Sequence, residues 1–298
     1  MKIGIMGGGA IGLFFAVEIA QEFPAVLFTK TIEQANAVTA QGVEVREKGK
    51  PAIYSIQAKP SEDALMKEMD LLVIALKQYQ LPAAIPILER LPKETALIFL
   101  QNGMGHVEVM DCLKQKNVFA ATVEHGVLRT GAAQIEVKGR SRTNIAVVRG
   151  SRNAISRFIE KMRDRFPFVW RDDAKWMLLE KLSANVVINP LTAILNSTNG
   201  ELLTNKHYFR LAQEIFKEFA AVFSEYETEK GWESIQRICQ ATSGNCSSML
   251  SDLKAGRPTE VDAIIGFVLS EADKNGIAVP ALQTVYHMVK GLEKTHAE

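Results

Sequence analysis

Six consecutive residues near the amino terminus have the spacing of a phosphate-binding loop. They form a G-x-G-x-x-G pattern: Gly7, Gly8, Gly9, Ala10, Ile11 and Gly12. A short apolar run (2–6) precedes the pattern and an apolar stretch (13–20) follows it, as expected for a strand and then a helix. The first glycine permits a tight turn, the second lets a pyrophosphate approach the backbone, and the third allows close helix–strand packing. Free N–H groups at the start of the helix then favour the phosphates.

The end of the second expected strand indicates which dinucleotide this loop binds. NAD-binding proteins of this type carry Asp or Glu there, which binds the ribose hydroxyls. This chain has Thr29, Lys30 and Thr31 instead, and Glu33 lies too far into the next helix. A cation flanked by two hydroxyls suits a 2′-phosphate, so we expect NADPH (NADP) to be preferred over NADH. The alternative is that Lys30 is an ordinary exposed lysine at a strand end.

A second group of polar residues lies far along the chain, in an otherwise apolar segment. Lys181, Asn185 and Asn189 are spaced four residues apart and therefore share one face of a helix. Asn199 would join that face about five turns after Lys181 at ~3.6 residues per turn, if the helix stays regular. Asn is a mediocre helix former, so its repetition suggests amides that bind a polar ligand. The alternative is an amphipathic helix with a thin polar stripe.

Lys181 has the chemistry of a general acid for ketone reduction. Hydride transfer to a carbonyl carbon builds negative charge on the oxygen, and a cation placed there stabilises the alkoxide and donates a proton. Three other polar residues, Lys77, Gln80 and Asn102, follow two apolar runs (71–76 and 95–100) with the composition of buried strands. Because the carboxyl ends of parallel strands line the ligand crevice, we expect these three residues beside the glycine loop.

The elements that must position these residues differ between the two halves of the chain. In the first half, strand patterns alternate with helical ones; the strand patterns cover 2–6, 25–29, 71–76, 95–100 and 118–123. Strands that are apolar on both faces indicate a mainly parallel sheet covered by helices. The second half shows only helical patterns, at 173–195, 208–231, 232–242, 260–275 and 280–294. We therefore expect an α/β Rossmann-type N-terminal domain (1–170) followed by an all-α C-terminal domain (171–298).

The composition is that of an ordinary globular protein. In 298 residues, Lys and Arg (35) nearly balance Asp and Glu (34), and a net charge of +1 gives no overall field to attract nucleic acid or an anionic membrane. The three cysteines form no C-x-x-C pair and the five histidines no H-E-x-x-H, so we expect no metal site. No apolar run reaches the ~18 residues of a membrane span, and glycines interrupt the first one, so we expect a cytoplasmic protein.

These segments closely resemble the ketopantoate reductase family. The resemblance is carried by the glycine loop, by Q-N-G-M-G (101–105), by K-L-x-x-N-x-x-x-N-P-L-T-A (181–193), by N-G-E-L-L (199–203) and by two later motifs (247–252 and 259–264). It extends from residue 1 to about residue 289. It implies an NADPH-dependent oxidoreductase that reduces 2-dehydropantoate to pantoate, a step of pantothenate and coenzyme A biosynthesis.

The resemblance also implies roles for individual residues. Lys181 corresponds to the general acid, Asn102 to a residue that touches cofactor and substrate, and Glu260 to a glutamate near the nicotinamide and its ribose. The other implied substrate-binding residues are Asn185, Asn189, Asn199, Asn245 and Ser248. The other implied cofactor-binding residues are the glycine loop (Gly7 to Gly12), Lys30 (often Arg in the family), Lys77, Gln80 and the backbone at Val127.

Several alternatives stay open at the level of the sequence. The enzyme could reduce another branched 2-keto acid, because one methylene in an aliphatic pocket is worth only ~1–3 kcal/mol. A non-catalytic NADPH-binding sensor would be expected to lack the Lys/Asn row, which is present. Glu260 could simply be a first-turn carboxylate, and Ser248 a helix N-cap. The partner we expect is a small-molecule substrate; a homodimer is compatible with the sequence, which does not determine the oligomeric state.

Overall fold

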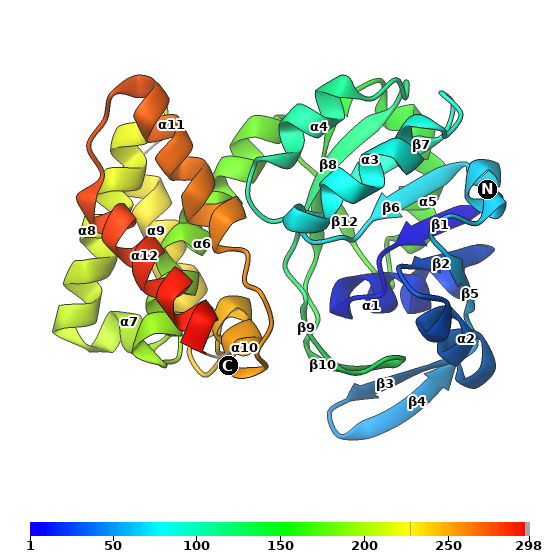
Figure 1. The fold of residues 1–298 in the computed structure, drawn as a ribbon, viewed down its shortest axis with the longest axis horizontal. Coiled ribbons are helices and arrows are strands. Elements are labelled where there is room, and N and C mark those ends of the chain that lie inside the picture. The colour runs from blue at the N-terminus through cyan, green and yellow to red at the C-terminus, as the bar shows by residue number, and fades with distance from the viewer. Residues whose placement is uncertain (227, 296–298) are drawn as a thin grey trace. The chain divides into compact units, whose positions relative to one another are not determined.

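The computed structural model describes residues 1–226 and 228–295 and divides into two compact units (Figure 1). The α/β unit comprises Met1–Gln101 and His106–Met177, and the helical unit comprises Asn102–Gly105 and Leu178–Glu298. The sequence places the domain boundary after residue 170. In the structure the division falls after Met177, inside the helix Ala174–Leu195. A short segment of the first half, Asn102–Gly105, groups with the second. Residues 296–298, at the end of the second expected domain, lie outside the described residues.

An eight-stranded sheet forms the centre of the α/β unit, with the strand order β12-β11-β8-β7-β6-β1-β2-β5. Its strands are β1 (Ile3–Met6), β2 (Ala25–Thr29), β5 (Gln57–Pro60), β6 (Leu71–Ile74), β7 (Ala96–Phe99), β8 (Val118–Val123), β11 (Thr143–Arg149) and β12 (Phe168–Trp170). Neighbouring strands pair in parallel except β8 and β11, which are antiparallel. β1, β6 and β7 are buried along their whole length, and the expected mainly parallel α/β fold is confirmed.

The helix that follows the glycine loop is enclosed on all sides. The α-helices of this unit are α1 (Ala10–Ala20), α2 (Ile32–Gln41), α3 (Leu81–Glu89), α4 (His106–Cys112) and α5 (Ser156–Met162). α1 contacts β1 and β2 of the central sheet and also strands of a second sheet, so it has no solvent-facing stripe. Its one buried carboxylate, Glu18, is paired with Arg140 at 3.0 Å and Arg165 at 3.1 Å. This enclosure explains why the segment after the glycine loop is apolar in every position but one.

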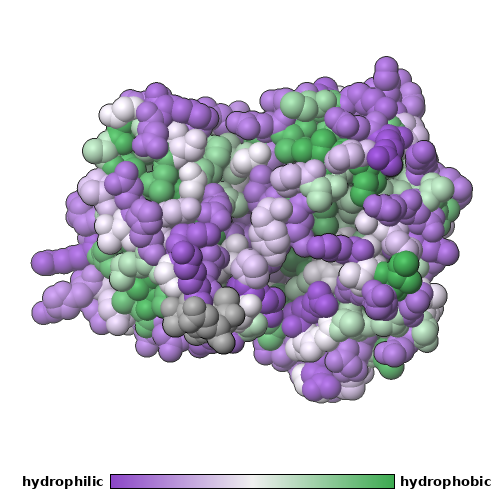
Figure 2. Space-filling view, in the orientation of Figure 1, coloured by the Kyte–Doolittle hydropathy of each residue, from purple (hydrophilic) through white to green (hydrophobic). Residues whose placement is uncertain are grey.

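The second sheet was not expected from the sequence. It has four strands in the order β4-β3-β10-β9: β4 (Lys50–Tyr54), β3 (Val43–Glu47), β10 (Gln134–Gly139) and β9 (Gly126–Gly131). The central pair, β3 and β10, is parallel and joins segments far apart in the sequence, so no local sequence pattern shows that these two strands pair. β4 is almost wholly exposed and carries the apolar Ile53 at 70% exposure. Figure 2 shows that hydrophilic residues cover much of one face of the protein, with separate hydrophobic areas between them.

The helical unit contains no β-strand among its described residues, and the expected all-α class is confirmed. Its helices are α6 (Ala174–Leu195, which begins in the α/β unit), α7 (Glu201–Thr204), α8 (Lys206–Val222), α9 (Thr228–Ala241), α10 (Ser248–Lys254), α11 (Phe267–Asn275) and α12 (Pro280–Thr295), with a π-helical segment at Asp262–Gly266. The single helix expected at 208–231 is wrong. The chain leaves helical geometry at Phe223 (φ −113°, ψ 69°), and the ring of Tyr226 turns in to pack on Phe216 and Phe219.

α6 alone among the helices of the described residues is long and apolar enough to cross a membrane. The share of its apolar window that is buried inside the protein is 78%. Such burial is typical of a core helix, and we draw no membrane assignment from its composition.

Candidate functional site

Two of the three patterned glycines are required by the backbone of the loop itself. Gly7 has a φ of +123°, and a Cβ there would lie 2.6 Å from the carbonyl oxygen of Ala75. A Cβ on Gly12 would lie 1.8 Å from the carbonyl oxygen of Gly7. The Gly7 N–H donates to the carbonyl of Phe28 at 2.8 Å, which ties the turn to the end of β2. The turn between β1 and α1 therefore forms only with glycine at these two positions.

Gly9 has a different explanation. It is the N-cap of α1 with φ −78° and ψ −176°, a conformation open to any residue. Within the described chain, no heavy atom lies within 4 Å of the place its Cβ would take. The protein itself does not need glycine here, whereas a pyrophosphate resting on the backbone at the helix start would. The loop thus fits a dinucleotide.

At the end of β2, the structure leaves fewer groups for a 2′-phosphate than the sequence suggested. Lys30 is exposed, as expected. The Thr29 hydroxyl, however, is fully buried and donates to the carbonyl of Thr31 at 2.8 Å. The Thr31 oxygen caps α2 by accepting from the N–H of Gln34 at 3.2 Å. The expectation of a cation with two available hydroxyls is therefore wrong for Thr29, whose hydroxyl is already used inside the chain.

Lys77 and Gln80 lie on one tight turn after β6. The Gln80 amide oxygen accepts from the Lys77 N–H at 2.9 Å, and the Gln80 N–H donates to the Lys77 carbonyl at 2.9 Å. A buried residue of the Q-N-G-M-G motif, for which we expected no role of its own, connects the end of β7 to the start of this turn. Gln101 donates from its amide nitrogen to the carbonyls of Ile74 and Leu76, both at 2.9 Å. Val127, the remaining implied cofactor contact of this unit, lies half-buried on β9.

In the helical unit, three of the implied site residues form one hydrogen-bonded set. The Asn102 amide nitrogen donates to the carboxylate of Glu260 at 2.9 Å, and the Asn185 amide nitrogen donates to the Asn102 amide oxygen at 3.4 Å. The segment 102–105 fits against the π-helical segment because Gly103, with φ +77°, brings its α-carbon close to the carbonyl of Ala263. A Cβ there would lie 2.1 Å from that oxygen. Glu260 is therefore more than a first-turn carboxylate.

The polar row of α6 is shorter than expected. Lys181 is half-buried, and Asn185 and Asn189 are each 7% exposed, on the helix as predicted. α6 ends at Leu195, and Asn196 adopts a positive φ of 48°, so Asn199 lies in the following loop and not on the same helix face. The helix ends at 195 as expected, so the condition for Asn199 to share its face, a helix that continues regularly, is not met; Asn readily adopts the left-handed conformation seen at Asn196.

Asn199 nevertheless has a defined orientation in its loop. Its amide nitrogen donates to the Thr242 hydroxyl at 2.8 Å, while the Thr242 hydroxyl hydrogen goes to the carbonyl of Ile238 at 2.6 Å. Thr242 can therefore only accept, which assigns the nitrogen of Asn199 to that side. The Asn199 amide oxygen is buried and has no hydrogen-bond partner among the described residues.

Asn245 and Ser248 are both exposed, and they lie close in sequence at the start of α10. The Asn245 carbonyl accepts from the Asn199 N–H at 3.0 Å, which brings the two implied residues together. Ser248 is not the N-cap of α10. Ser247 is, accepting from the Leu250 N–H at 3.1 Å, so the structural alternative for Ser248 is wrong.

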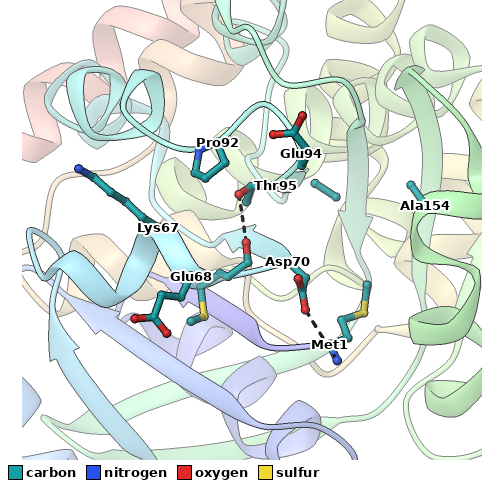
Figure 3. Close-up of a pocket in the computed structure, with 10 residues that line it drawn as sticks. Met1, Lys67, Glu68, Asp70, Pro92, Glu94, Thr95 and Ala154 are labelled. Atoms are coloured by element: carbon teal, nitrogen blue, oxygen red, sulfur yellow. Dashed lines mark hydrogen bonds and ion pairs between the residues drawn. The ribbon is translucent and has the colours of Figure 1, made fainter.

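A hollow of about 470 Å³ lies at the opposite edge of the central sheet, where β1, β6 and β7 begin (Figure 3). Two contacts join groups of its lining: the Met1 amino group lies 3.7 Å from Asp70, and the Thr95 hydroxyl donates to the Met69 carbonyl at 3.0 Å. Ligands of open α/β sheets bind at the carboxyl ends of the strands. We assign this hollow no part in the site. Within residues 1–226 and 228–295, no group of three His, Cys, Asp or Glu side chains could hold a metal ion.

Both halves of the chain match models of one protein family. Residues 3–150 match the model for ketopantoate reductase PanE/ApbA, and residues 173–293 match the model for its C-terminal part. The chain belongs to the ketopantoate reductase family. Among curated relatives, the 2-dehydropantoate 2-reductase of Bacillus subtilis is 35% identical over 99% of this chain and 98% of its own. That of Vibrio cholerae is 32% identical over 99% of each chain.

Solved structures agree with this family assignment. The probable 2-dehydropantoate 2-reductase of Bacillus subtilis superimposes with a TM-score of 0.89 at 34% identity, over 98% of this chain and 100% of that one. A D-mandelate dehydrogenase bound to NADH and anilino(oxo)acetate reaches the same TM-score of 0.89 at 22% identity, which shows a shared fold alone. The chain therefore shares with its family the combination of an α/β unit and a helical unit.

Proposed function

We propose that the protein is a 2-dehydropantoate 2-reductase that uses NADPH to form (R)-pantoate. The observation that carries the proposal is the hydrogen-bonded set of Asn102, Asn185 and Glu260, with Lys181 one turn before Asn185 on α6. These residues belong to motifs of a family whose curated members in Bacillus subtilis and Vibrio cholerae carry this name. The bound cofactor supplies hydride to the carbonyl carbon of the keto acid.

The residues of the α/β unit hold the cofactor. The N-terminus of α1, with its open backbone at Gly9, would hold the pyrophosphate. The other cofactor contacts that we propose in this unit are Gly7, Gly8, Ala10, Ile11, Gly12, Lys30, Lys77, Gln80 and Val127. From the helical unit, Asn102 and Glu260 complete the set.

Lys181 acts at the carbonyl oxygen. As negative charge builds there, the ammonium group stabilises it and transfers one proton, so that the carbonyl oxygen becomes the new hydroxyl of pantoate and the lysine regains its proton from solvent. Asn185 lies one turn further along α6 and orients the substrate for this step. Through Asn102, it is also linked to Glu260.

The other amides and hydroxyls bind the rest of the substrate. The Asn199 amide oxygen is a buried acceptor, so we assign to it the terminal hydroxyl of 2-dehydropantoate and not the carboxylate. Asn189, Asn245 and Ser248 bind the remaining oxygens.

A substrate panel followed by NADPH absorbance tests the proposed activity. We expect the highest kcat/KM with 2-dehydropantoate, and little turnover with keto acids that lack its hydroxyl. A higher kcat/KM with another branched 2-keto acid would assign the enzyme to that substrate. Binding of NADPH without turnover of any keto acid would make the protein a sensor.

We also propose that the enzyme is a cytoplasmic homodimer with a small-molecule keto acid as its substrate partner. A ketopantoate reductase of Staphylococcus aureus, 23% identical, is described as dimeric. Light scattering coupled to gel filtration would return twice the 33.0 kDa chain mass if this holds, and a single chain mass would contradict it.

A further inference from the structure

The C-terminal helix α12 is hydrogen-bonded to the residue that directly precedes Glu260. Glu293 of α12 accepts from the Thr259 N–H at 2.8 Å and from the Thr259 hydroxyl at 2.7 Å. The hydrogen of that hydroxyl is thus committed to Glu293, and its oxygen accepts from the Val261 N–H at 3.2 Å. Both chain neighbours of Glu260 are therefore tied, directly or through Thr259, to one carboxylate.

The contact between Thr259 and Glu293 is mostly buried, whereas a second contact of α12 with this segment is exposed. Thr259 is 4% exposed and the Glu293 side chain 16%. Asp262, which accepts from Tyr286 at 2.7 Å and pairs with Lys290 at 3.1 Å, has a side chain that is 65% exposed. Exposed ion pairs contribute little, while hydrogen bonds to a charged acceptor are the strong ones. We therefore attribute the hold of α12 on this segment mainly to Glu293.

The carboxylate of Glu293 has a separate partner for each oxygen. One oxygen accepts both hydrogen bonds from Thr259, and the other lies 2.9 Å from the Lys290 ammonium. Burial acts to raise the pKa of Glu293, but Lys290 and the two donors of Thr259 together hold that pKa below its ordinary value. Glu293 is therefore a charged acceptor at neutral pH.

The segment that α12 holds also contacts residues of the proposed site. The Glu260 carboxylate accepts from the Asn102 amide at 2.9 Å, and the Ala263 carbonyl leaves no room for a Cβ on Gly103. Asn102 in turn accepts from Asn185 of α6 at 3.4 Å. Because a hydrogen bond depends on the placement of both groups, a shift of Glu260 would also change the orientation of the Asn102 amide.

We propose that Glu293 is a positioning residue for Glu260 and, through Glu260, for the Asn102 amide. It fixes the backbone on both sides of Glu260 and needs no contact of its own with substrate or cofactor. The proposal rests on the proposed function, in which Glu260 and Asn102 contact the cofactor. Glu293→Ala removes the acceptor of both Thr259 hydrogen bonds. We expect it to lower kcat/KM roughly ten- to a hundredfold, the cost of a small misplacement of site groups.

A double-mutant cycle of Glu293→Ala with Glu260→Ala tests this role. Both kcat/KM with 2-dehydropantoate and the Kd of NADP⁺ would be measured for each variant. If Glu293 acts through Glu260, its removal should have its full effect when Glu260 is present and cost less than about threefold in the Glu260→Ala background. The melting temperature should fall by a similar amount in both backgrounds, because the contact with Thr259 is lost in both.

Glu271→Ala is the matched control. Glu271 is a half-buried carboxylate on α11 that pairs with Lys274 three residues away, as Glu293 pairs with Lys290. Its removal should leave kcat/KM and Kd unchanged. Glu293→Gln keeps an oxygen that can accept from Thr259 and should retain most of the activity. If Glu293→Ala does not fold, Thr259→Val, which removes the hydroxyl half of the contact, takes its place in the cycle.

Two results would overturn the assignment of Glu293. Equal factors of loss in both backgrounds would mean that Glu293 only stabilises the fold, and unchanged kcat/KM and Kd in Glu293→Ala would mean that Glu260 is positioned without it. Failure of the proposed function looks different, since the unmodified protein would then not turn over 2-dehydropantoate. In that case the cycle measured as the Kd of NADP⁺ would still decide the role of Glu293.

Discussion

Hydrogen bonds within the protein fix the orientation of several site side chains in the helical unit. Thr242 must accept from Asn199 because its own hydrogen goes to Ile238, and Asn102 donates to Glu260 and accepts from Asn185. What each side chain can still offer to a ligand follows from these bonds. This makes the roles of single residues testable one atom at a time.

Lys181→Ala should lower kcat and kcat/KM together by roughly 10²–10⁴-fold, the usual worth of a positioned acid. NADP⁺ binding, measured by calorimetry, should not change. Lys175→Ala removes an exposed lysine near the start of the same helix and should leave turnover as it is. If Lys181→Ala raised KM and left kcat unchanged, Lys181 would anchor the substrate and the proton would come from elsewhere.

Asn199→Ala should weaken the binding of 2-dehydropantoate by roughly tenfold, because the variant lacks the buried amide oxygen that accepts from the substrate hydroxyl. A keto acid without the terminal hydroxyl, such as 3-methyl-2-oxobutanoate, should bind the variant and the unmodified protein alike. Steady-state KM values for the two substrates provide the measurement. A variant that loses affinity for both to the same degree would place Asn199 at the carboxylate or keto group.

His106 predicts how stability depends on pH. The ring is fully buried against Phe99, neither nitrogen has a hydrogen-bond partner among the described residues, and burial lowers its pKa to about 4 from 6.5. Between pH 6.5 and about pH 4, this histidine is protonated in the unfolded chain and neutral in the folded protein. The contribution of His106 to the free energy of unfolding should therefore be greatest above pH 6.5, and it should fall by roughly 3 kcal/mol as the pH drops to about 4.

Urea unfolding at several pH values would measure this loss. His106→Phe should flatten the profile in that range, while the exposed His207→Phe should not. Burial also lowers the pKa of His125 to about 4, so part of the loss should remain in His106→Phe. An unchanged profile in that variant would show that other groups control acid stability.

Among the elements of the fold, the glycine loop contains one glycine that the folded backbone requires and another that we assign to cofactor binding. Gly12→Ala places a Cβ 1.8 Å from a backbone oxygen, so the junction of β1 and α1 must distort. Gly9→Ala meets nothing in the described chain. We expect Gly12→Ala to lower the melting temperature by several degrees and Gly9→Ala to leave it nearly unchanged while weakening NADP⁺.

Thermal unfolding with and without NADP⁺ distinguishes the two variants. The cofactor should raise the melting temperature of the unmodified protein, because it binds the folded state, and raise that of Gly9→Ala much less. Full stabilisation of Gly9→Ala by NADP⁺ would mean that the pyrophosphate does not touch this position.

Elements with a local signal could be predicted from the sequence. The glycine loop and the buried strands β1, β6 and β7 depend on spacing and composition within a few residues. The strands of the second sheet also carry a local signal, since apolar residues alternate with polar ones in β3 and β10, but we drew no prediction from it. The sequence could not show that these two distant strands pair.

The candidate site shows the same limit. Lys181, Asn185 and Asn189 follow from helical spacing, whereas Asn199 leaves the helix because a single residue, Asn196, takes a positive φ. The bond between Asn102 and Glu260 joins residues that are far apart in sequence, and only the fold brings them together.

At the scale of the whole molecule, the order of the chain and the order of the units differ. The chain passes from the α/β unit to the helical unit after Gln101, returns at His106 and leaves again after Met177. Asn102–Gly105 is thus a part of the helical unit that is encoded inside the other. The carbonyl of Ala263 fits against Gly103 with no room for a Cβ.

This arrangement limits how genes of this family can be recombined. A chimera joined once, at 177/178, would combine residues 102–105 of one parent with the π-helical segment of the other, and would test whether the two were selected together. Exchanging 102–105 along with the helical half should restore melting temperature and turnover where the single joint lowers them. Equal performance of both chimeras would show that the two segments accept any partner within the family. Restoration by the double exchange would instead make the heritable module of this enzyme the helical half plus four residues encoded in the first half of the gene.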